Sequence, residues 1–414
     1  MVWGRMRIAN RWTGIGLGCL LIGLLGGFIA GKHIGFNQGA DRRRQSPNGS
    51  ILCKPGPWGD LSYTPFTIAA PDQSVPVRPI EANGAHWFFE GSTAAGFAAR
   101  LQSIRLAPDQ RHALLDPAVL HVRADGIDLT PSPDLVISLP ADARAAIYQL
   151  LAQFPENRSE IYFVRKDTIA DHFSDSGVSA DTVALFERLS WEHGNYLVFA
   201  GLPALLSRLP ADEDKRHFLK ALTRQRTMLL RLRITPASDV RALAQYWAKG
   251  AWDTDVQTIF QSLTSIPTGA WISILMVLPP LPSTEIYNYP SVTADSPEAS
   301  PVNQDSHWTS LNFFRDVPDP NFGKPEYVLR ELRETYFPST GDPRYGDVVL
   351  FRKPDGTMIH SAVYIADDIC FTKNGSAVTD PWMLNTISDL IEQFSFQVPP
   401  DQHLTVSYFR CKNL

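Results

Sequence analysis

The sequence predicts an α+β chain with three parts: an N-terminal transmembrane helix, a mostly α-helical middle domain, and a C-terminal α+β domain with a small antiparallel sheet. Three observations lead to this fold class. A long apolar run lies near the N-terminus, apolar residues recur at helical spacing through the middle, and three strand-like runs lie near the C-terminus. The chain has 414 residues, of which 44% are hydrophobic, so it can form about two or three domains with a sizeable core.

The first part is predicted to anchor the chain in a membrane. Residues 13–34 contain an uncharged run from Thr13 to Gly31, close to the roughly 20 apolar residues that span a bilayer. A basic flank, 1–12, precedes the run, and 35–56 form a juxtamembrane linker. Because the run is longer than a usual signal-peptide core and lacks a small-residue cleavage site, we expect an uncleaved single-pass anchor.

Glycines in the predicted anchor recur every four residues, at Gly23, Gly27 and Gly31. This spacing places them near one helix face, where small residues allow two membrane helices to approach closely. A helix-mediated dimer is one interpretation. The other is that glycine is simply common in membrane helices.

Residues 57–289 are predicted to form a mostly helical accessory domain. Apolar spacing and capping residues indicate four helices, and we find no internal repeat. The helices are Pro140–Phe154, one capped by Ser179, Ala211–Leu232 and Ser238–Gly250. Shorter strand-like pieces lie at Ile161–Val164 and Trp271–Leu278. The domain is interpreted as a scaffold or recognition element.

Charged residues of this domain give little sign of chemistry. His172 and His193 have no second metal ligand at helical spacing, so surface or capping roles are expected. Basic residues are assigned to one amphipathic helix, where we expect a solvated face rather than an anion site. They are Lys215, Arg216, His217, Arg224, Arg226, Arg231 and Arg233.

Composition excludes several classes of function. A formal net charge of −5 gives no basic footprint for nucleic acid, so no nucleic-acid partner is expected. The chain has four cysteines but no CxxC or Cys/His cluster, so neither a metal nor a cofactor is predicted. One disulfide among Cys53, Cys370 and Cys411 can form if they lie outside the cell, but the odd number argues against a disulfide framework.

The C-terminal part is predicted to contain a tight antiparallel sheet. Val348–Phe351, His360–Ile365 and Ile369–Lys373 read as strands, separated by turn residues at 353–356 and 366–368. We also expect helices over Pro325–Tyr336 and Trp382–Phe394 and a closing strand over Leu404–Phe409.

His360 is a candidate general base because it begins the middle strand. A three-residue loop at 366–368 would place His360 opposite Asn374, and side chains opposed in this way have Cβ atoms roughly 4.5–5.5 Å apart. An amide at that distance can orient an imidazole. The structural alternative is that His360 is an ordinary strand-end residue.

A candidate nucleophile lies upstream, after a Pro- and Ser-rich linker at 290–303. Asp305 or Ser306 is a good N-cap, and Trp308 and Leu311 follow at helical spacing. The positive end of the helix dipole favours a developing anion, so Ser306 is placed where a nucleophile is useful.

These motifs carry a family resemblance. Gly346–Phe351 (GDVVLF) and His360–Ile365 (HSAVYI), together with Ser306 at a helix start, resemble the NlpC-type, papain-like cell-wall peptidases. The resemblance implies that Ser306 occupies the nucleophile position, where the family has cysteine, and that His360 is the base. The family's spacing assigns the third polar residue to Thr372, whereas the strand register selects Asn374.

The resemblance covers residues 304–414, implies a papain-like α+β fold there, and places the bulk of the chain outside the cell membrane. A serine hydroxyl must lose its proton to the base as it attacks, whereas a cysteine thiolate forms near neutral pH. Two hypotheses follow. The first is a catalytically weakened or inactive envelope protein that binds or scaffolds peptidoglycan or another envelope component. The second is an active hydrolase that cleaves peptidoglycan peptide amide bonds with Ser306 and His360.

Overall fold

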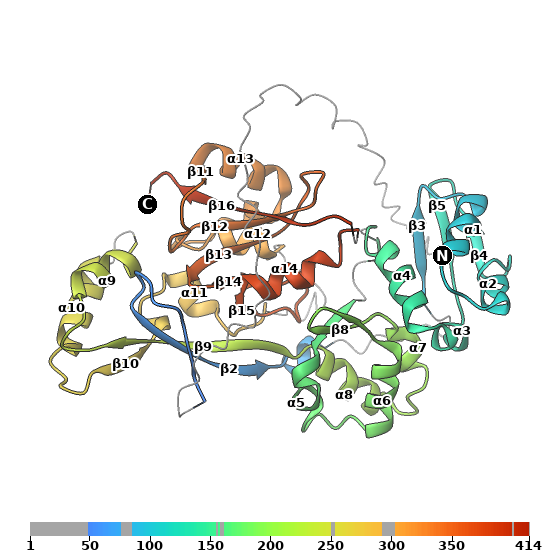
Figure 1. Ribbon diagram of the computed structural model, residues 1–414, viewed down its shortest axis with the longest axis horizontal. Coiled ribbons are helices and arrows are strands. Elements are labelled where there is room, and N and C mark those ends of the chain that lie inside the picture. Colours follow the sequence, from blue (N-terminus) through green and yellow to red (C-terminus); the bar gives the residue numbers. More distant parts are fainter. Residues whose placement is uncertain are drawn as a thin grey trace, which may run out of the picture. The chain divides into compact units, whose positions relative to one another are not determined.

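Figure 1 shows the computed structural model of the chain. It describes residues 49–75, 85–154, 156–157, 161–249, 253–291, 303–399 and 401–413. All of these residues belong to one unit, residues 43–414.

The predicted fold class is wrong in two respects. Among the described residues, no helix is long and apolar enough to cross a membrane. The anchor predicted at 13–34, with Gly23, Gly27 and Gly31, lies outside the described residues. The middle region is also not mostly helical, because it contributes three antiparallel sheets in addition to its helices.

The largest of these three sheets joins the beginning of the described chain to its middle. Its strand order is β1-β2-β9-β10, and every neighbouring pair is antiparallel. The strands are β1 (Ile51–Leu52), β2 (Asp60–Ile68), β9 (Gln225–Ile234) and β10 (Ala270–Ser273). The helices that follow β9 and β10 are α9 (Val240–Trp247), α10 (Asp253–Leu263) and α11 (Pro280–Glu285), with a 3₁₀ turn at Ile274–Met276.

Strand β9 shows why the long helix predicted over Ala211–Leu232 is wrong. From Met228 to Ile234, buried residues alternate with exposed ones, which is the period of a strand with one buried face. Helix α8 (Asp212–Leu222) ends before this alternation begins. The leucines and arginines of this run are compatible with a helix by composition. Its buried residues, however, recur with a period of two.

Two smaller three-stranded sheets form a tandem repeat. Each copy runs strand, two helices, two strands, two helices, and in each sheet the third strand lies between the other two. The first copy is β3 (Trp87–Glu90), α1 (Ala94–Ser103), α2 (Pro108–Leu114), β4 (Leu120–Val122), β5 (Gly126–Leu129), α3 (Pro133–Ser138) and α4 (Ala141–Leu151). The second is β6 (Tyr162–Arg165), α5 (Ile169–Phe173), α6 (Ala180–Leu189), β7 (Trp191–His193), β8 (Tyr196–Phe199), α7 (Leu202–Leu206) and α8.

Sequence identity at one junction supports the repeat. Leu139–Asp142 (LPAD) recurs 70 residues later as Leu209–Asp212, in both copies where the last helix begins. The expectation that the chain contains no repeat is therefore wrong. It failed because identical residues occur at only a few positions, and elsewhere the strands and helices of the two copies share only their pattern of polar and apolar residues.

The C-terminal region forms a six-stranded antiparallel sheet with the order β11-β16-β12-β13-β14-β15. Its strands are β11 (Tyr336–Ser339), β12 (Val348–Arg352), β13 (Met358–Ala366), β14 (Ile369–Lys373), β15 (Trp382–Thr386) and β16 (Thr405–Cys411). Its helices are α12 (Ser306–Leu311), α13 (Pro325–Thr335) and α14 (Ile387–Ser395), with a 3₁₀ turn at Pro320–Gly323.

The predicted strands at 348–351, 360–365 and 369–373 are confirmed, whereas the helix predicted over Trp382–Phe394 is wrong in its first half. Residues 382–386 form β15, and Thr386 then caps α14 by accepting a hydrogen bond from the backbone N–H of Asp389 at 3.1 Å. All five residues of β15 are buried, so their apolar character does not alternate. A fully buried strand is hard to distinguish from a helix by period alone.

The sheet separates two apolar layers. On one face Val348, Val363 and Phe371 pack with Trp308 of α12. On the other face Val349, Ala362 and Cys370 pack with Leu390 of α14. Successive residues of a strand point to opposite faces, so α12 and α14 lie on opposite sides of the same sheet.

The C-terminal sheet and the β1-β2-β9-β10 sheet share a core. Leu61 and Leu230 of the latter belong to the same buried cluster as Leu384 of β15. Thr227 of β9 joins the two sheets directly, because its Oγ1 donates to the carbonyl of Leu384 at 2.9 Å and accepts from the N–H of that residue at 3.2 Å. Within the described part of the chain, no disulfide joins Cys53, Cys370 and Cys411 to one another.

Candidate functional site

Ser306 is the first residue of α12. Asp305 is the N-cap, and its Oδ1 accepts the backbone N–H groups of His307 and Trp308, both at 2.9 Å. The helix is held against β15 because Thr309 Oγ1 accepts the indole N–H of Trp382 at 3.0 Å. Ser306 is therefore at the helix start, as predicted, and it is buried, with 5% of its surface exposed.

His360 lies on the opposite face of the sheet from α12. Its imidazole stacks on Phe394 of α14, with ring centroids 4.2 Å apart and an interplanar angle of 24°, and it also contacts Phe351. The next residue, Ser361, points to the α12 face. Within the described part of the chain, no hydrogen bond joins Ser306 to His360.

Thr372, rather than Asn374, contacts the imidazole. Thr372 Oγ1 lies 2.9 Å from Nε2 of His360 and 3.2 Å from the carbonyl oxygen of Ser361. Because a carbonyl only accepts, the single hydroxyl proton goes to Ser361, and Thr372 accepts from the Nε2–H of His360. Asn374 is instead 3.5 Å from Gln393, and its Oδ1 is buried with no hydrogen-bond partner.

The strand register explains this outcome. Val363 pairs with Phe371 and Tyr364 with Cys370, which is the register that the sequence predicted. The loop has two residues instead of three, because Ala366 pairs with Ile369 and the irregularity at that point restores the register. Strand β14 ends at Lys373, so the residue that reaches the imidazole is the diagonal neighbour Thr372.

Ser361 is the centre of a closed polar network on the α12 face. Its Oγ lies 3.0 Å from each of three atoms: the carbonyl oxygen of Ser306, Oγ of Ser310 and Nδ1 of His307. The single hydroxyl proton of Ser361 goes to the carbonyl of Ser306 or to Oγ of Ser310, so Nδ1–H of His307 donates to Ser361. Ser306 Oγ accepts the backbone N–H of Ser361 at 3.3 Å. These groups satisfy one another without a ligand.

Burial keeps both histidines of this region neutral. It lowers the pKa of His360 well below its ordinary 6.5, and the nearby His307 lowers it further. Burial also lowers the pKa of His307, although the charge of Asp305 partly opposes the effect. A neutral imidazole can accept a proton, but neither ring is hydrogen-bonded to the hydroxyl of Ser306.

Lys373 and Asp380 place two ionisable groups beside this network. Lys373 is fully buried and donates from Nζ to the carbonyls of Gly375 and Ala377, at 2.7 and 3.0 Å. Burial lowers the pKa of Lys373 to about 8, although Asp380 and Asp305 oppose the change. Burial raises the pKa of Asp380.

The Asp of the GDVVLF motif has a structural role. Asp347 accepts two hydrogen bonds from Arg410 of β16, at 2.9 and 2.7 Å, and one from the backbone N–H of Arg344. Gly346 adopts φ +88°, and a Cβ atom there would lie 2.5 Å from the ring of Phe314. This motif therefore fixes the start of β12 against β16.

Comparison with known proteins adds no relative. No protein-family model, curated protein or solved structure matches this chain.

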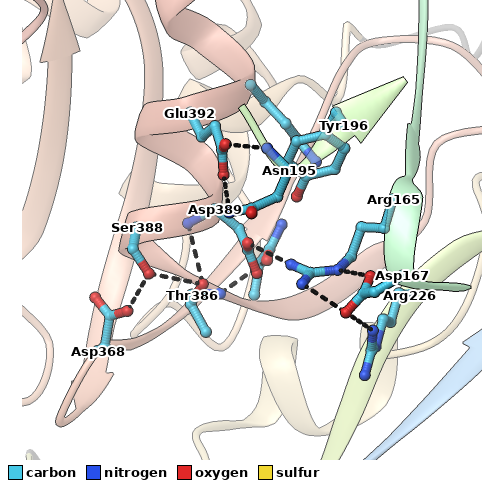
Figure 2. A network of polar contacts seen from close by, with 12 residues as sticks. Arg165, Asp167, Asn195, Tyr196, Arg226, Asp368, Thr386, Ser388, Asp389 and Glu392 are labelled. Carbon is cyan, nitrogen blue, oxygen red and sulfur yellow. Dashed lines mark hydrogen bonds and ion pairs between the residues drawn. The ribbon is translucent and has the colours of Figure 1, made fainter. Parts of the chain in front are cut away.

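A second site lies where three parts of the molecule meet. A cavity of about 300 Å³ is bordered by β2, β6, β9 and the segment from β15 into α14. Figure 2 shows the polar network along its wall, with Arg165 between Asp167 and Asp389 and with Arg226 beside Asp167. No residue among Ser306, His360, Thr372 and Asn374 lines this cavity.

All three guanidinium nitrogens of Arg165 donate hydrogen bonds to carboxylates in that wall. Its Nε and Nη2 each donate to Asp167 at 3.0 Å, and its Nη1 donates to Asp389 at 2.8 Å. Burial alone would lower the pKa of Arg165, but the bonds to Asp167 and the charge of Asp389 raise it, so the guanidinium stays charged. Hydrogen bonds between Gln393 and Tyr196 and between Asn195 and Glu392 extend the same junction.

Sequence reasoning missed this cavity. Arg226 and Arg224 were assigned to a solvated helix face, but Arg226 lies on a strand and both line the cavity. His172, expected at the surface, is mostly buried in the cavity wall, and burial together with the charge of Arg224 lowers its pKa to about 4. The available signal was the period-two alternation after Arg226. Among the described residues, no three His, Cys, Asp or Glu side chains gather as a metal site requires.

Proposed function

We propose that this chain is a non-catalytic binding or scaffolding protein of the cell envelope, and that its C-terminal domain keeps the element order of NlpC-type peptidases without their chemistry. The order of elements supports the resemblance: Ser306 opens α12, and β12, β13 and β14 follow with Asp347, His360 and Thr372. Peptidoglycan or another envelope component is the first partner to test.

One observation carries the non-catalytic part of the proposal. The hydroxyl of Ser306 accepts a backbone N–H from Ser361, while the imidazole of His360 stacks on Phe394 across the sheet. A nucleophile and its base need to be within hydrogen-bond reach, about 2.6–3.2 Å. Without that contact, a serine hydroxyl has no group to take its proton.

The competing hypothesis is the hydrolase that uses Ser306 and His360. One observation favours it: Thr372 holds Nε2–H of His360, which leaves the lone pair on Nδ1, as an oriented base requires. The two hypotheses differ in whether the lone pair on Nδ1 of His360 takes the proton from the side chain of residue 306.

Replacing Ser306 with cysteine distinguishes them. We would alkylate Ser306→Cys with iodoacetamide across about pH 5 to 10 and quantify the modified peptide by mass spectrometry. We expect the introduced thiol to react with a midpoint at or above the ordinary thiol pKa of about 8.5. We also expect His360→Gln to leave the midpoint unchanged, and peptidoglycan to stay intact with the wild type and the variant.

A midpoint below about pH 7 that rises in the double variant with His360→Gln would overturn the non-catalytic proposal, as would hydrolysis of peptidoglycan. Cys411 supplies an internal reference for alkylation in each sample, because it is only half-buried. Cys370 is fully buried, and burial raises its pKa well above the ordinary value, so it is expected to stay unmodified while the protein is folded.

A further inference from the structure

The cavity beside Arg226 combines a net positive charge with hydrogen-bond donors that have no acceptor. Three arginines and two aspartates line it, namely Arg165, Arg224, Arg226, Asp167 and Asp389. His172 adds no charge near neutral pH, because its pKa is about 4. The wall therefore carries one formal positive charge in excess.

Of the two arginines other than Arg226, one is fully used by the protein and one is partly used. Arg165 is saturated by the carboxylates of Asp167 and Asp389. Every hydrogen bond of Arg224 within the described ranges comes from Nη1, which donates to the carbonyls of Asp171, His172 and Ser174 and so holds a loop. The positive charges outside Arg165 and its two carboxylates are therefore those of Arg224 and Arg226, and the one with an enclosed, unpaired nitrogen is Arg226.

Arg226 has unused donors. Its nearest carboxylate oxygen, Oδ2 of Asp167, is 3.8 Å from Nη1, which is too far for a hydrogen bond. That Nη1 is buried and has no hydrogen-bond partner. Nη1 is thus an enclosed, charged donor without an acceptor, so a ligand that supplies the acceptor is favoured.

Asn385 provides a second, independent donor. It lines the cavity with only 6% of its surface exposed, and its Oδ1 accepts the N–H of Thr386 at 2.8 Å. No hydrogen bond within the described ranges uses its Nδ2. Arg226 and Asn385 flank the same junction, because their neighbours Thr227 and Leu384 are hydrogen-bonded to each other.

We propose that this cavity binds a small organic monocarboxylate, with its carboxylate on Arg226 and Asn385 and its apolar part against Met228 and Met383. A guanidinium matches the two oxygens of a carboxylate, so the charge on Arg226 is suited to this group. One excess positive charge fits a monoanion. A phosphate monoester carries about −1.5 to −2, and Asp167 and Asp389 in the wall oppose the additional charge. A volume of about 300 Å³ is at the lower end of ligand cavities.

The experiment uses the methionine methyl groups of the full-length protein as reporters. Met228 and Met383 line the cavity, whereas Met276 and Met358 do not and serve as references. With ¹³C-methyl methionine labelling, we would titrate acetate, N-acetyl-L-leucine, the uncharged N-acetyl-L-leucinamide and inorganic phosphate. We expect saturable shifts of the Met228 and Met383 signals with a carboxylate and none with the amide.

Two arginine variants test the assigned contact. Arg226→Gln is expected to weaken carboxylate binding about tenfold or more, since a hydrogen bond to a charged group is lost. Arg231→Gln makes the same change on an exposed position of the same strand and is expected to bind like the wild type. Arg226→Lys, which keeps the charge but not the planar fork, is expected to lie between them.

Four results would overturn the proposal: no saturable shift with either carboxylate, equal shifts with the acid and the amide, a response to phosphate alone, or unchanged binding in Arg226→Gln. Unchanged signals from Met276 and Met358 establish that each variant is folded. The test is independent of catalysis, because it measures occupancy of a cavity that excludes Ser306 and His360.

Discussion

The surroundings of Ser306 and the cavity beside Arg226 both contain buried polar groups but use them differently. Around Ser306, the hydroxyl of Ser361 links a carbonyl, a second hydroxyl and an imidazole at 3.0 Å each. In the cavity, Nη1 of Arg226 has no hydrogen-bond partner among the described residues, and none of them uses the amide nitrogen of Asn385.

The difference shows two possible roles of a buried polar residue. Buried donors and acceptors are normally paired, so a cluster that pairs internally stabilises the fold. Donors that remain unpaired beside a cavity are available for a ligand. Ser306 and His360, whose polar groups pair within the protein, belong to the first kind, and Arg226 belongs to the second. Removing a polar group should therefore alter stability in the first region and binding in the second.

The largest expected effect concerns the pH dependence contributed by Lys373. Its pKa falls from an ordinary 10.5 to about 8 in the folded protein. Between these values the unfolded chain binds more protons than the folded one, so stability rises with pH. The gain is complete above the unfolded pKa and is lost as the pH falls through about 8. Over that window, the free energy of unfolding gains about 3 kcal/mol at most.

Lys373→Met isolates this contribution. We expect the difference in unfolding free energy between the wild type and the variant to change by roughly 2–3 kcal/mol from about pH 8 to pH 10, in favour of the wild type at high pH. Urea denaturation at each pH measures it. A difference that is flat with pH would mean that Lys373 is ionised in the folded state and that the region is less closed than described.

The next largest effect is expected for Ser361→Ala. The substitution removes the hydroxyl that hydrogen-bonds the carbonyl of Ser306, Oγ of Ser310 and Nδ1 of His307, at a position where Ser361 is only 1% exposed. Leaving these groups unpaired should destabilise the protein by about 2 kcal/mol. Ser339→Ala in β11 of the same sheet is the matched control, and urea unfolding with an unchanged m value is the measurement. Equal midpoints for the two variants would contradict the closed network.

The C-terminal elements were predictable because their signals are local. Turn residues bound the strands at 348–351 and 369–373, and one capping carboxylate marks the start of α12. The predictions that failed concern how these elements are placed relative to one another. The alternation along β13 places Ser361 and His360 on opposite faces, but the sequence does not say which helix covers which face. That depends on packing against Phe394 and Trp308.

The cavity was beyond prediction for a similar reason. Its wall comes from residues far apart in the chain, such as Arg226 and Asn385, and it exists only because β9 and β15 lie side by side. Thr372 shows that even a correct register does not identify the contact residue. The register of β13 and β14 was predicted, but the position at which β14 ends decides which side chain reaches the imidazole of His360. The tandem repeat, in turn, is visible in one short identity at Leu139–Asp142 and otherwise only in topology.

The smallest expected effect is that of Arg226→Gln on the stability of the ligand-free protein, and it is the most specific control for the comparison of the two regions. Arg226 has no hydrogen bond to lose within the described ranges, and its ion pair with Asp167 spans 3.8 Å with both side chains partly exposed. Arg226→Gln, measured by urea unfolding without added ligand, should therefore change the free energy of unfolding by less than about 0.5 kcal/mol. With a saturating carboxylate, the wild type should gain stability over the variant, because a ligand that binds only the folded state stabilises it. A loss comparable to that of Ser361→Ala in the absence of ligand would show that Arg226 supports the fold, and the distinction between the two regions would fail.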